Sequence, residues 1–242
     1  MTRGALAVIA AVFAVSVVAP PAVQAQSAGE QVKCGAINTF ASTSTEALRI
    51  GTVAMKNTFE LNIKLLQTAW DVQDAATEAL RDTGEVVFSA KISLIKKLPV
   101  LNAVKKQALK DYETGILVSF SKRNLDIDAA HAAYREDLMA VIREHHKVLT
   151  DLVATLTADI DKALDVAKEK CKEAGSVTNL AVAVAEAKVK LAAAGVREEA
   201  RAIGEAVKLH VKRNLAIIDA GKTYVKEATQ LVKTVTKAVL GR

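Results

Sequence analysis

The sequence predicts an all-α fold: an elongated antiparallel bundle of three long, coiled-coil-like legs. The first observation is composition, because the chain is 51% hydrophobic but only 4% aromatic, and it is rich in Ala, Val, Lys and Glu, as long helices are. The second is the scarcity of breaks, because Pro99 is the one proline after residue 25, whereas a β-protein needs many turns. The third is periodicity, because apolar residues recur every three or four positions over long stretches. The apolar content also argues against disorder.

The first 25 residues have the pattern of a secretory signal peptide. A single positive charge, Arg3, precedes an apolar run of 15 residues, 5–19, and Val23-Gln24-Ala25 provides a small-residue cleavage site. The alternative is a membrane anchor, but the run is shorter than the ~20 residues that a spanning helix needs. We therefore expect residues 1–25 to be removed and the mature chain to be secreted, extracellular or periplasmic.

Helix starts and stops divide the mature chain. The signals are a capping box at Thr43 and Glu46, a stop at Asp82-Thr83-Gly84, a helix-disfavouring Pro99 and a terminal glycine, Gly175. They predict an extended segment at 26–42 and helical runs at 43–82, 85–98, 100–174 and 177–240. The first two runs make one leg, broken near 82–84, so that residues 43–242 form a single elongated helical-bundle domain.

Each leg carries a row of apolar residues at the spacing of one buried helix face. In the first leg the row is Leu48, Thr52, Met55, Phe59, Ile63, Leu66 and Trp70. In the middle leg it is Leu138, Ile142, His145, Leu149, Leu152, Leu156, Ile160, Ala163 and Ala167. In the last leg a heptad row runs through Val182, Val189, Val196, Ile203, His210, Ile217, Tyr224 and Leu231. Such seams are satisfied within one chain or between copies, so a homo-oligomer is one expected assembly.

One stretch of the sequence occurs twice. KRNLDIDAAHAAY, residues 122–134, returns as KRNLAIIDAGKTY, residues 212–224, with seven identical positions. If the chain folds back at Gly175, the two copies lie opposite each other and antiparallel, related by a local two-fold axis. We interpret this echo as chance or as a duplicated helix that serves packing. The alternative is a paired functional site, or a basic patch that is repeated.

The two cysteines, Cys34 and Cys171, are expected to form a disulfide, because a secreted chain matures in an oxidising compartment. In the predicted bundle Cys171 lies beside the turn at Gly175, and Cys34 precedes the first leg at the same end. The alternative is two free thiols. Two sulfurs without a nearby histidine pair do not make a metal site, so we expect no bound metal.

The sequence contains no catalytic motif, so we expect no enzyme, no catalytic residue and no cofactor. The four histidines, His131, His145, His146 and His210, do not have the His-x-x-x-His or Glu-x-x-His spacing of helical metal sites. Glycine-rich phosphate loops and the Gly-x-Ser-x-Gly elbow are also missing. His145 and His146 are adjacent and therefore point to different helix faces. Histidines in a helix seam usually serve register, or occasionally a pH response.

The positive charge is concentrated in the last leg. Residues 176–242 contain twelve Lys/Arg and six Asp/Glu, whereas residues 26–175 contain 20 and 21. A basic amphipathic helix can lie on anionic lipid or attract an anionic polymer; the alternative is an ordinary solvated helix face. The candidate surface-binding residues are Lys208, Lys212, Arg213, Lys222, Lys226, Lys233 and Lys237. Specific nucleic-acid recognition is not expected, because this leg has few aromatic residues for base stacking.

Residues 85–101, EVVFSAKISLIKKLPVL, fit a period of two as well as a helical period. As a helix this segment is apolar on two sides, so we expect it either to lie buried between layers or to enter lipid. The membrane-insertion candidates are Phe88, Ile92, Leu94 and Ile95. In architecture, a secreted bundle that hides one apolar segment resembles helical pore-forming toxins. Amphipathic helices that open onto lipid likewise resemble exchangeable apolipoproteins.

The sequence supports one main functional hypothesis and two alternatives. The main hypothesis is a non-enzymatic protein that binds an amphipathic or anionic surface, lipid or polyanion, through its basic last helix. The first alternative is a structural or interaction coiled coil that acts as a spacer or an oligomerising scaffold. The second is a protein like a pore-forming toxin, in which residues 85–101 insert into the membrane.

Overall fold

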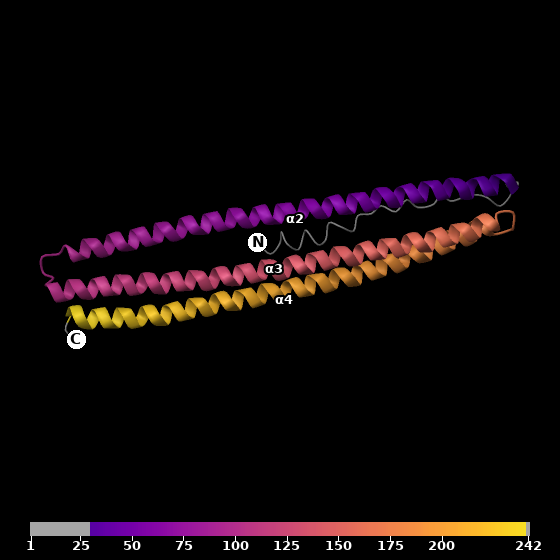
Figure 1. Ribbon diagram of the computed structural model, residues 1–242. Coiled ribbons are helices and arrows are strands. Elements are labelled where there is room, and N and C mark those ends of the chain that lie inside the picture. The colour runs from indigo at the N-terminus through magenta and orange to yellow at the C-terminus, as the bar shows by residue number, and fades with distance from the viewer. Residues whose placement is uncertain (1–29, 241–242) are drawn as a thin grey trace. The chain divides into compact units, whose positions relative to one another are not determined.

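The computed structural model describes the backbone of residues 30–240 and the side chains of residues 34–240. Its elements are three long helices, α2 (Glu30–Lys96), α3 (Ala103–Glu169) and α4 (Ser176–Leu240) (Figure 1). The described residues contain no strand, and the three helices pack against one another as an all-α bundle. The predicted fold class is confirmed. The expected signal peptide, residues 1–25, lies outside the described residues.

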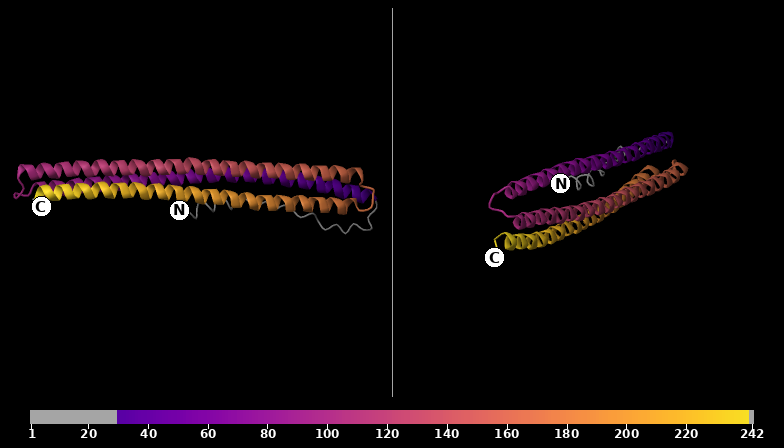
Figure 2. Two further views of the ribbon diagram at one scale, coloured as in Figure 1. Left: turned by 90° about the horizontal axis from the view of Figure 1, so that it is seen from below. Right: turned by 60° about the vertical axis from the view of Figure 1, so that its left-hand side comes forward.

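The chain divides into two compact units, and each unit takes a part of all three helices. Unit 1 comprises residues 30–66 and 140–206 and contains the α3–α4 connection. Unit 2 comprises residues 67–139 and 207–240 and contains the α2–α3 connection. Within each unit, consecutive helices run antiparallel (Figures 1 and 2).

The first helix begins earlier than the sequence predicted. Residues 30–42 are helical rather than extended, while residues 26–29 lie outside the described residues. The physical reason is tertiary packing: Ile37 is buried in the unit 1 core, and the burial of an apolar face, more than local propensity, stabilises helices in proteins.

The expected capping box is wrong because its residues lie inside the helix. Thr43 Oγ1 donates a hydrogen bond to the backbone oxygen of Thr39, one helical turn earlier. Glu46 forms an ion pair with Arg49, one turn later. Both side chains therefore find local partners on a continuous helix, and the motif marks no helix start.

The expected break at 82–84 is also wrong. α2 continues through Gly84, and Thr83 Oγ1 donates to the backbone oxygen of Ala79 as in an uninterrupted helix. A glycine in a helix costs roughly 1 kcal/mol relative to alanine. Tertiary contacts offset such a cost, and at this point Arg81 makes two hydrogen bonds to the carboxylate of Asp128 on α3.

The two connections follow the expected chemistry, with shifted helix ends. α2 ends at Lys96, shortly before Pro99, and α3 begins at Ala103, after Asn102. The Asn102 side chain accepts a hydrogen bond from the backbone of Lys105, which caps the new helix. After α3, Gly175 has a φ of 84°, the left-handed conformation in which glycine terminates helices.

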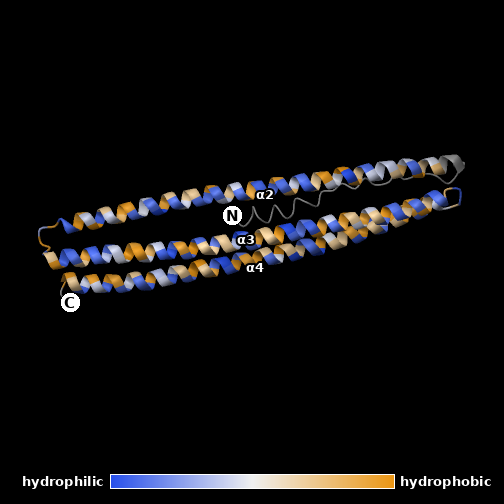
Figure 3. Ribbon diagram, in the orientation of Figure 1, coloured by the Kyte–Doolittle hydropathy of each residue, from blue (hydrophilic) through white to orange (hydrophobic). Residues whose placement is uncertain are grey.

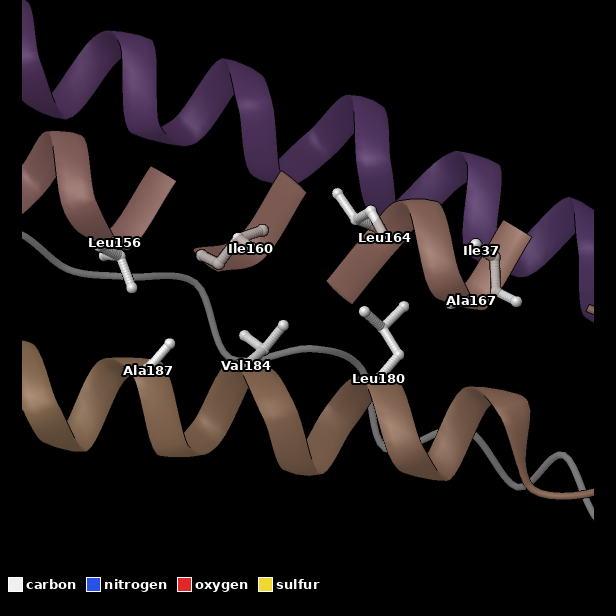
Figure 4. Close-up of a cluster of buried hydrophobic side chains, with 8 residues drawn as sticks. All are labelled: Ile37, Leu156, Ile160, Leu164, Ala167, Leu180, Val184 and Ala187. Atoms are coloured by element: carbon white, nitrogen blue, oxygen red, sulfur yellow. The ribbon is translucent and has the colours of Figure 1, made fainter. Parts of the chain in front are cut away.

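Unit 1 has a core of eight buried apolar side chains contributed by all three helices. They are Ile37, Leu156, Ile160, Leu164, Ala167, Leu180, Val184 and Ala187 (Figure 4). The predicted row of the middle leg is largely confirmed, because seven of its nine members are buried: Leu138, Ile142, His145, Leu149, Leu156, Ile160 and Ala167. Of the predicted α2 row only Met55 is fully buried, so the inward face of α2 is more weakly marked.

The predicted heptad row of α4 faces solvent at its first three positions only, and its later members, Ile203, His210, Ile217, Tyr224 and Leu231, are half-buried. Val182, Val189 and Val196 are 52%, 68% and 64% exposed, and α4 buries Leu180 and Val184 instead. The physical reason is drift: a straight α-helix turns by about 20° per heptad relative to a strict seven-residue repeat. Apolar and polar residues are interspersed along all three helices (Figure 3).

The predicted disulfide is confirmed. Cys34 of α2 and Cys171, just after α3, are bonded with their Cα atoms 5.1 Å apart. The bond closes a loop across 137 positions of sequence, and disulfides typically contribute about 2–4 kcal/mol to stability. It lies in unit 1 beside the Gly175 turn, so it ties the start of α2 to the α3–α4 connection.

In unit 2 the two copies of the echo face each other, as predicted. The guanidinium of Arg123 lies 5.7 Å from the ring centre of Tyr224, and that of Arg213 lies 4.6 Å from the ring centre of Tyr134. These are the same two residues of the motif with their helices exchanged. The α3–α4 contact therefore has a local two-fold symmetry, and the stacked cations stabilise both of its ends.

The symmetry extends beyond the echoed stretch itself. The equivalent ion pairs are Lys122–Glu227 and Lys212–Asp137, and the equivalent edge-on ring contacts are Phe120–Tyr224 and His210–Tyr134. In each set the corresponding residues are ninety positions apart. Three kinds of contact thus repeat in one register, which favours the interpretation as a duplicated packing unit.

Candidate functional site

The solvent face of α4 in unit 2 carries a row of exposed apolar side chains. Its members are Val207, Val211, Leu215, Ile218, Val225 and Val232, each at least 45% exposed. Their spacing of three, four and seven residues places them on one helix face, and the packed face of α4 points instead toward the echo contact. We call these six residues the apolar row.

Most of the predicted surface-binding lysines lie along one side of the apolar row. By helical spacing, the row's close neighbours are Lys208, Lys222, Lys226 and Lys233, whereas Lys212 and Lys237 lie further round the same side. Lys212 pairs with Asp137 and Lys222 with Asp219, both in exposed surroundings. Lys226, Lys233 and Lys237 form no ion pair within the described part of the chain.

Arg213 does not belong with these lysines. Its guanidinium stacks on Tyr134 and donates hydrogen bonds to His210 and Asn214. It is half-buried, and its charge serves the α3–α4 contact. The sequence could not separate Arg213 from Lys212, because the two are adjacent in a basic motif.

The structure divides the four membrane-insertion candidates into two pairs. Ile92 is buried and Phe88 is half-buried, with its ring 6.1 Å from the ring of Tyr112 on α3. Leu94 and Ile95 are 65% and 41% exposed. The first pair therefore holds α2 against α3, and only the second pair faces solvent.

The apolar residues that follow this pair were not among the four named insertion candidates, although two of them lie within residues 85–101. Leu98, Val100 and Val104 are 48%, 79% and 72% exposed and lie in or next to the α2–α3 connection. The charge pattern does distinguish this region in the sequence, because residues 86–110 contain six lysines and no Asp or Glu. The surface-binding candidates were chosen by total charge, which is highest in the last leg, so the lysines of this acid-free stretch were not among them.

The adjacent histidines of α3 lie on different helix faces, as predicted, and contact different helices. His145 is buried, with Nδ1 3.3 Å from the carboxylate of Glu198 on α4, and its Nε2 has no hydrogen-bond partner among the described residues. A hydrogen bond from Arg201 lowers the pKa of Glu198, and the contact with His145 adds to this while burial opposes it. His146 stacks on the ring of Phe59 of α2, with ring centres 3.9 Å apart. This arrangement fixes helix register in unit 1.

Between residues 30 and 240 no group of three or more His, Cys, Asp or Glu side chains is placed to hold a metal ion. Within the same range, none of the helices combines the length and the apolar character needed to cross a membrane.

Comparisons of the chain with known protein families, with curated proteins and with solved structures find no match.

Proposed function

We propose that this protein is a secreted, non-enzymatic binder of anionic surfaces, lipid or polyanion, and that α4 is its binding helix. The pattern of residues 1–25 supports secretion. We propose no reaction, because the sequence contains no catalytic motif.

One observation carries the proposal: in unit 2 the exposed apolar row of α4 is bordered on one side by lysines. Interfacial helices have this arrangement, because the apolar side chains enter the boundary between headgroups and acyl chains. Lysine stems cover apolar surface while their ammonium groups stay with the phosphates and water. Among the described residues of α4 that follow Val207, only Asp219 and Glu227 are acidic, so there is little repulsion to overcome.

Co-sedimentation with lipid vesicles tests the proposal. The mature chain is mixed with phosphatidylcholine vesicles, with or without phosphatidylserine, and is also applied to immobilised heparin as a polyanion. We expect binding to the anionic vesicles and to heparin, weaker binding at raised salt because exposed charges are screened, and little binding to neutral vesicles. No binding to either anionic probe at low salt would contradict the proposal.

A charge-matched pair of variants locates the binding face. Each lysine near an anionic bilayer contributes about 1 kcal/mol, so Lys222→Gln/Lys226→Gln/Lys233→Gln should bind anionic vesicles roughly a hundredfold more weakly. The control, Lys147→Gln/Lys162→Gln/Lys172→Gln, removes the same charge from exposed positions of unit 1. Equal losses in the two variants would show that binding follows total charge and not this face of α4.

A second candidate function has its own supporting observation. On α4 in unit 1, an exposed heptad row consists of Val182, Val189 and Val196. A row of this spacing is typical of a coiled-coil seam, which packs against a partner helix. This row favours a scaffold that associates with itself. Light-scattering mass measured on the same sample distinguishes the two candidates: a defined oligomer that binds neither vesicles nor heparin would favour the scaffold.

A further inference from the structure

The α2–α3 connection and the end of α4 meet at one end of unit 2. The views in Figures 1 and 2 agree in placing the end of α4 beside this connection. The contact between Gly115 and Leu231 sets the register, because a Cβ built on the glycine would lie 2.8 Å from Leu231 Cδ2. We call residues 86–110 and 228–240 together the hairpin end.

The hairpin end contains eight lysines and no acidic residue. The lysines are Lys91, Lys96, Lys97, Lys105, Lys106, Lys110, Lys233 and Lys237. Lys96 pairs with Glu113, which lies just outside the hairpin end; the other seven form no ion pair with any described residue. Such a one-signed surface attracts anions and has no carboxylate to repel them.

Large apolar side chains are exposed among these lysines. Leu94, Leu98, Val100 and Val104 are all exposed at or next to the connection, and Leu240 is 65% exposed at the end of α4. Soluble proteins seldom expose apolar side chains in contiguous groups without an interaction partner. These residues add nothing to the interior of unit 2, so stability does not explain them.

The bundle holds this end in place from the inside. Ile92, Leu109 and Ile116 are buried between the helices, the Phe88 and Tyr112 rings meet, and the Lys96–Glu113 pair joins α2 to α3. The exposed apolar side chains therefore project from a supported turn. Little conformational entropy is lost when such a preorganised surface binds.

We propose that the hairpin end is a lipid-insertion site. Leu94, Leu98, Val100 and Val104 enter the boundary between headgroups and acyl chains of an anionic bilayer, and the surrounding lysines contact the lipid phosphates. The inference rests on the proposed function and narrows its partner from any anionic surface to lipid, because a polyanion offers nothing to the apolar side chains. Residues 94–104 are far shorter than the ~20 residues that span a bilayer as a helix, so insertion is interfacial.

A pair of triple variants tests the site without changing charge. In the hairpin variant, Leu98→Gln/Val100→Gln/Val104→Gln replaces three exposed apolar side chains at the connection. In the control variant, Leu80→Gln/Val118→Gln/Leu125→Gln replaces three exposed apolar side chains of unit 2 outside the hairpin end. Circular dichroism on both variants verifies that the helices are intact.

The expected results separate lipid from polyanion. Partition of the hairpin variant into phosphatidylcholine–phosphatidylserine vesicles should fall by about tenfold or more, as expected from the lost transfer of apolar side chains. The control variant should bind within about twofold of the parent chain, since its substitutions lie outside the inserting surface. Retention on heparin should be the same for all three proteins, because none of them has lost a charge.

An introduced tryptophan reports insertion directly. In a Trp70→Phe background, which removes the single native tryptophan, Val100→Trp is compared with Leu125→Trp on vesicles of brominated lipid. We expect quenching at position 100 and not at position 125. If the chain binds vesicles while position 100 is unquenched and the hairpin variant binds as well as its parent, this inference is wrong and the proposed function stands. If the parent chain binds neither vesicles nor heparin, both are wrong.

Discussion

At the scale of single residues, the echo contact shows how a repeated motif becomes a repeated interaction. Each copy's lysine pairs with a carboxylate just beyond the opposite copy, and each copy's arginine stacks on the tyrosine of the opposite copy. If the seven identical residues were a chance match, there would be no reason for the two copies to make equivalent contacts. Because the pairs lie at both ends of the contact, they fix α3 and α4 in one register.

This symmetry predicts similar effects from equivalent substitutions. Tyr134→Leu and Tyr224→Leu each remove a ring that contacts both an arginine and a second ring, so each should lower the free energy of unfolding by about 0.5–1.5 kcal/mol. The sites lie far apart along the helices, so the double variant should show roughly additive losses. Urea unfolding followed by circular dichroism measures both. The controls Tyr134→Phe and Tyr224→Phe retain the ring and should be close to neutral.

An unequal result would contradict the duplicated unit. If one leucine variant lost stability and the other did not, the two contacts would differ in energy despite their shared geometry. The sequence identity between the two copies would then be due to chance.

At the scale of elements, the predictions succeeded where burial sets the pattern and failed where local chemistry was given too much weight. The row of α3 was predicted because α3 packs against both other helices, and its inward side chains are accordingly apolar. The row of α4 is exposed at Val182, Val189 and Val196 and half-buried from Ile203 onward, because a strict seven-residue repeat does not stay on one face of a straight helix over eight repeats. Gly84 predicts a stop, but α2 continues through it, because Arg81 holds this part of α2 to Asp128 of α3.

Because α2 is continuous at Gly84, replacing this glycine by alanine is expected to stabilise the protein. A Cβ added at Gly84 meets no atom within 4 Å, and the residue is helical. Gly84→Ala should therefore raise the free energy of unfolding by about 0.5–1 kcal/mol, because it reduces the entropy of the unfolded chain. Gly175→Ala is the matched control and should be destabilising, because Gly175 has a positive φ. Thermal and urea unfolding measure whether each variant is more or less stable than the parent chain. A Gly84→Ala variant no more stable than its parent would indicate that the helix is interrupted there.

At the scale of the whole chain, the candidate site was only partly predictable because folding brings distant segments together. The lysines of α4 were found from charge along the sequence. The hairpin end combines residues 86–110 with residues 228–240, and neither segment alone has the full set of lysines. The sequence alone also does not reveal that Leu98, Val100 and Val104 are exposed, because exposure depends on which side of each helix is covered.

The histidines give the whole chain a predictable response to acid. Burial lowers the pKa of His131, and the nearby Arg213 and Arg135 add to this, while Asp128 and Asp74 oppose it. Burial also lowers the pKa of His146 and of His210, with a further contribution from His145 to the first and from Arg213 to the second. These three residues come from both units, so the effect is not confined to one region.

The sign follows from proton linkage. A folded state with lowered histidine pKa values binds fewer protons than the unfolded chain, whose histidines titrate near ~6.5. The stability is fully present above that pH and decreases as the pH falls toward the folded-state pKa values. Hydrogen bonds from Arg135 lower the pKa of Asp74, and those from Arg201 lower the pKa of Glu198. Their contributions are lost only at lower pH, as the pH falls below the ordinary carboxyl range near ~4.

Measurements between about pH 7.5 and pH 5.5 therefore isolate the histidines, because the carboxylates stay charged throughout this range. We expect the midpoint of thermal unfolding to fall as the pH is lowered across it. The variant His131→Gln/His146→Gln/His210→Gln should show a smaller fall, whatever its absolute stability, because glutamine does not titrate. The comparison uses the difference between two pH values within each protein, so packing changes caused by the substitutions largely cancel. A parent chain that is equally stable at both pH values, or a triple variant with an unchanged pH dependence, would show that these histidines are not kept neutral by the fold.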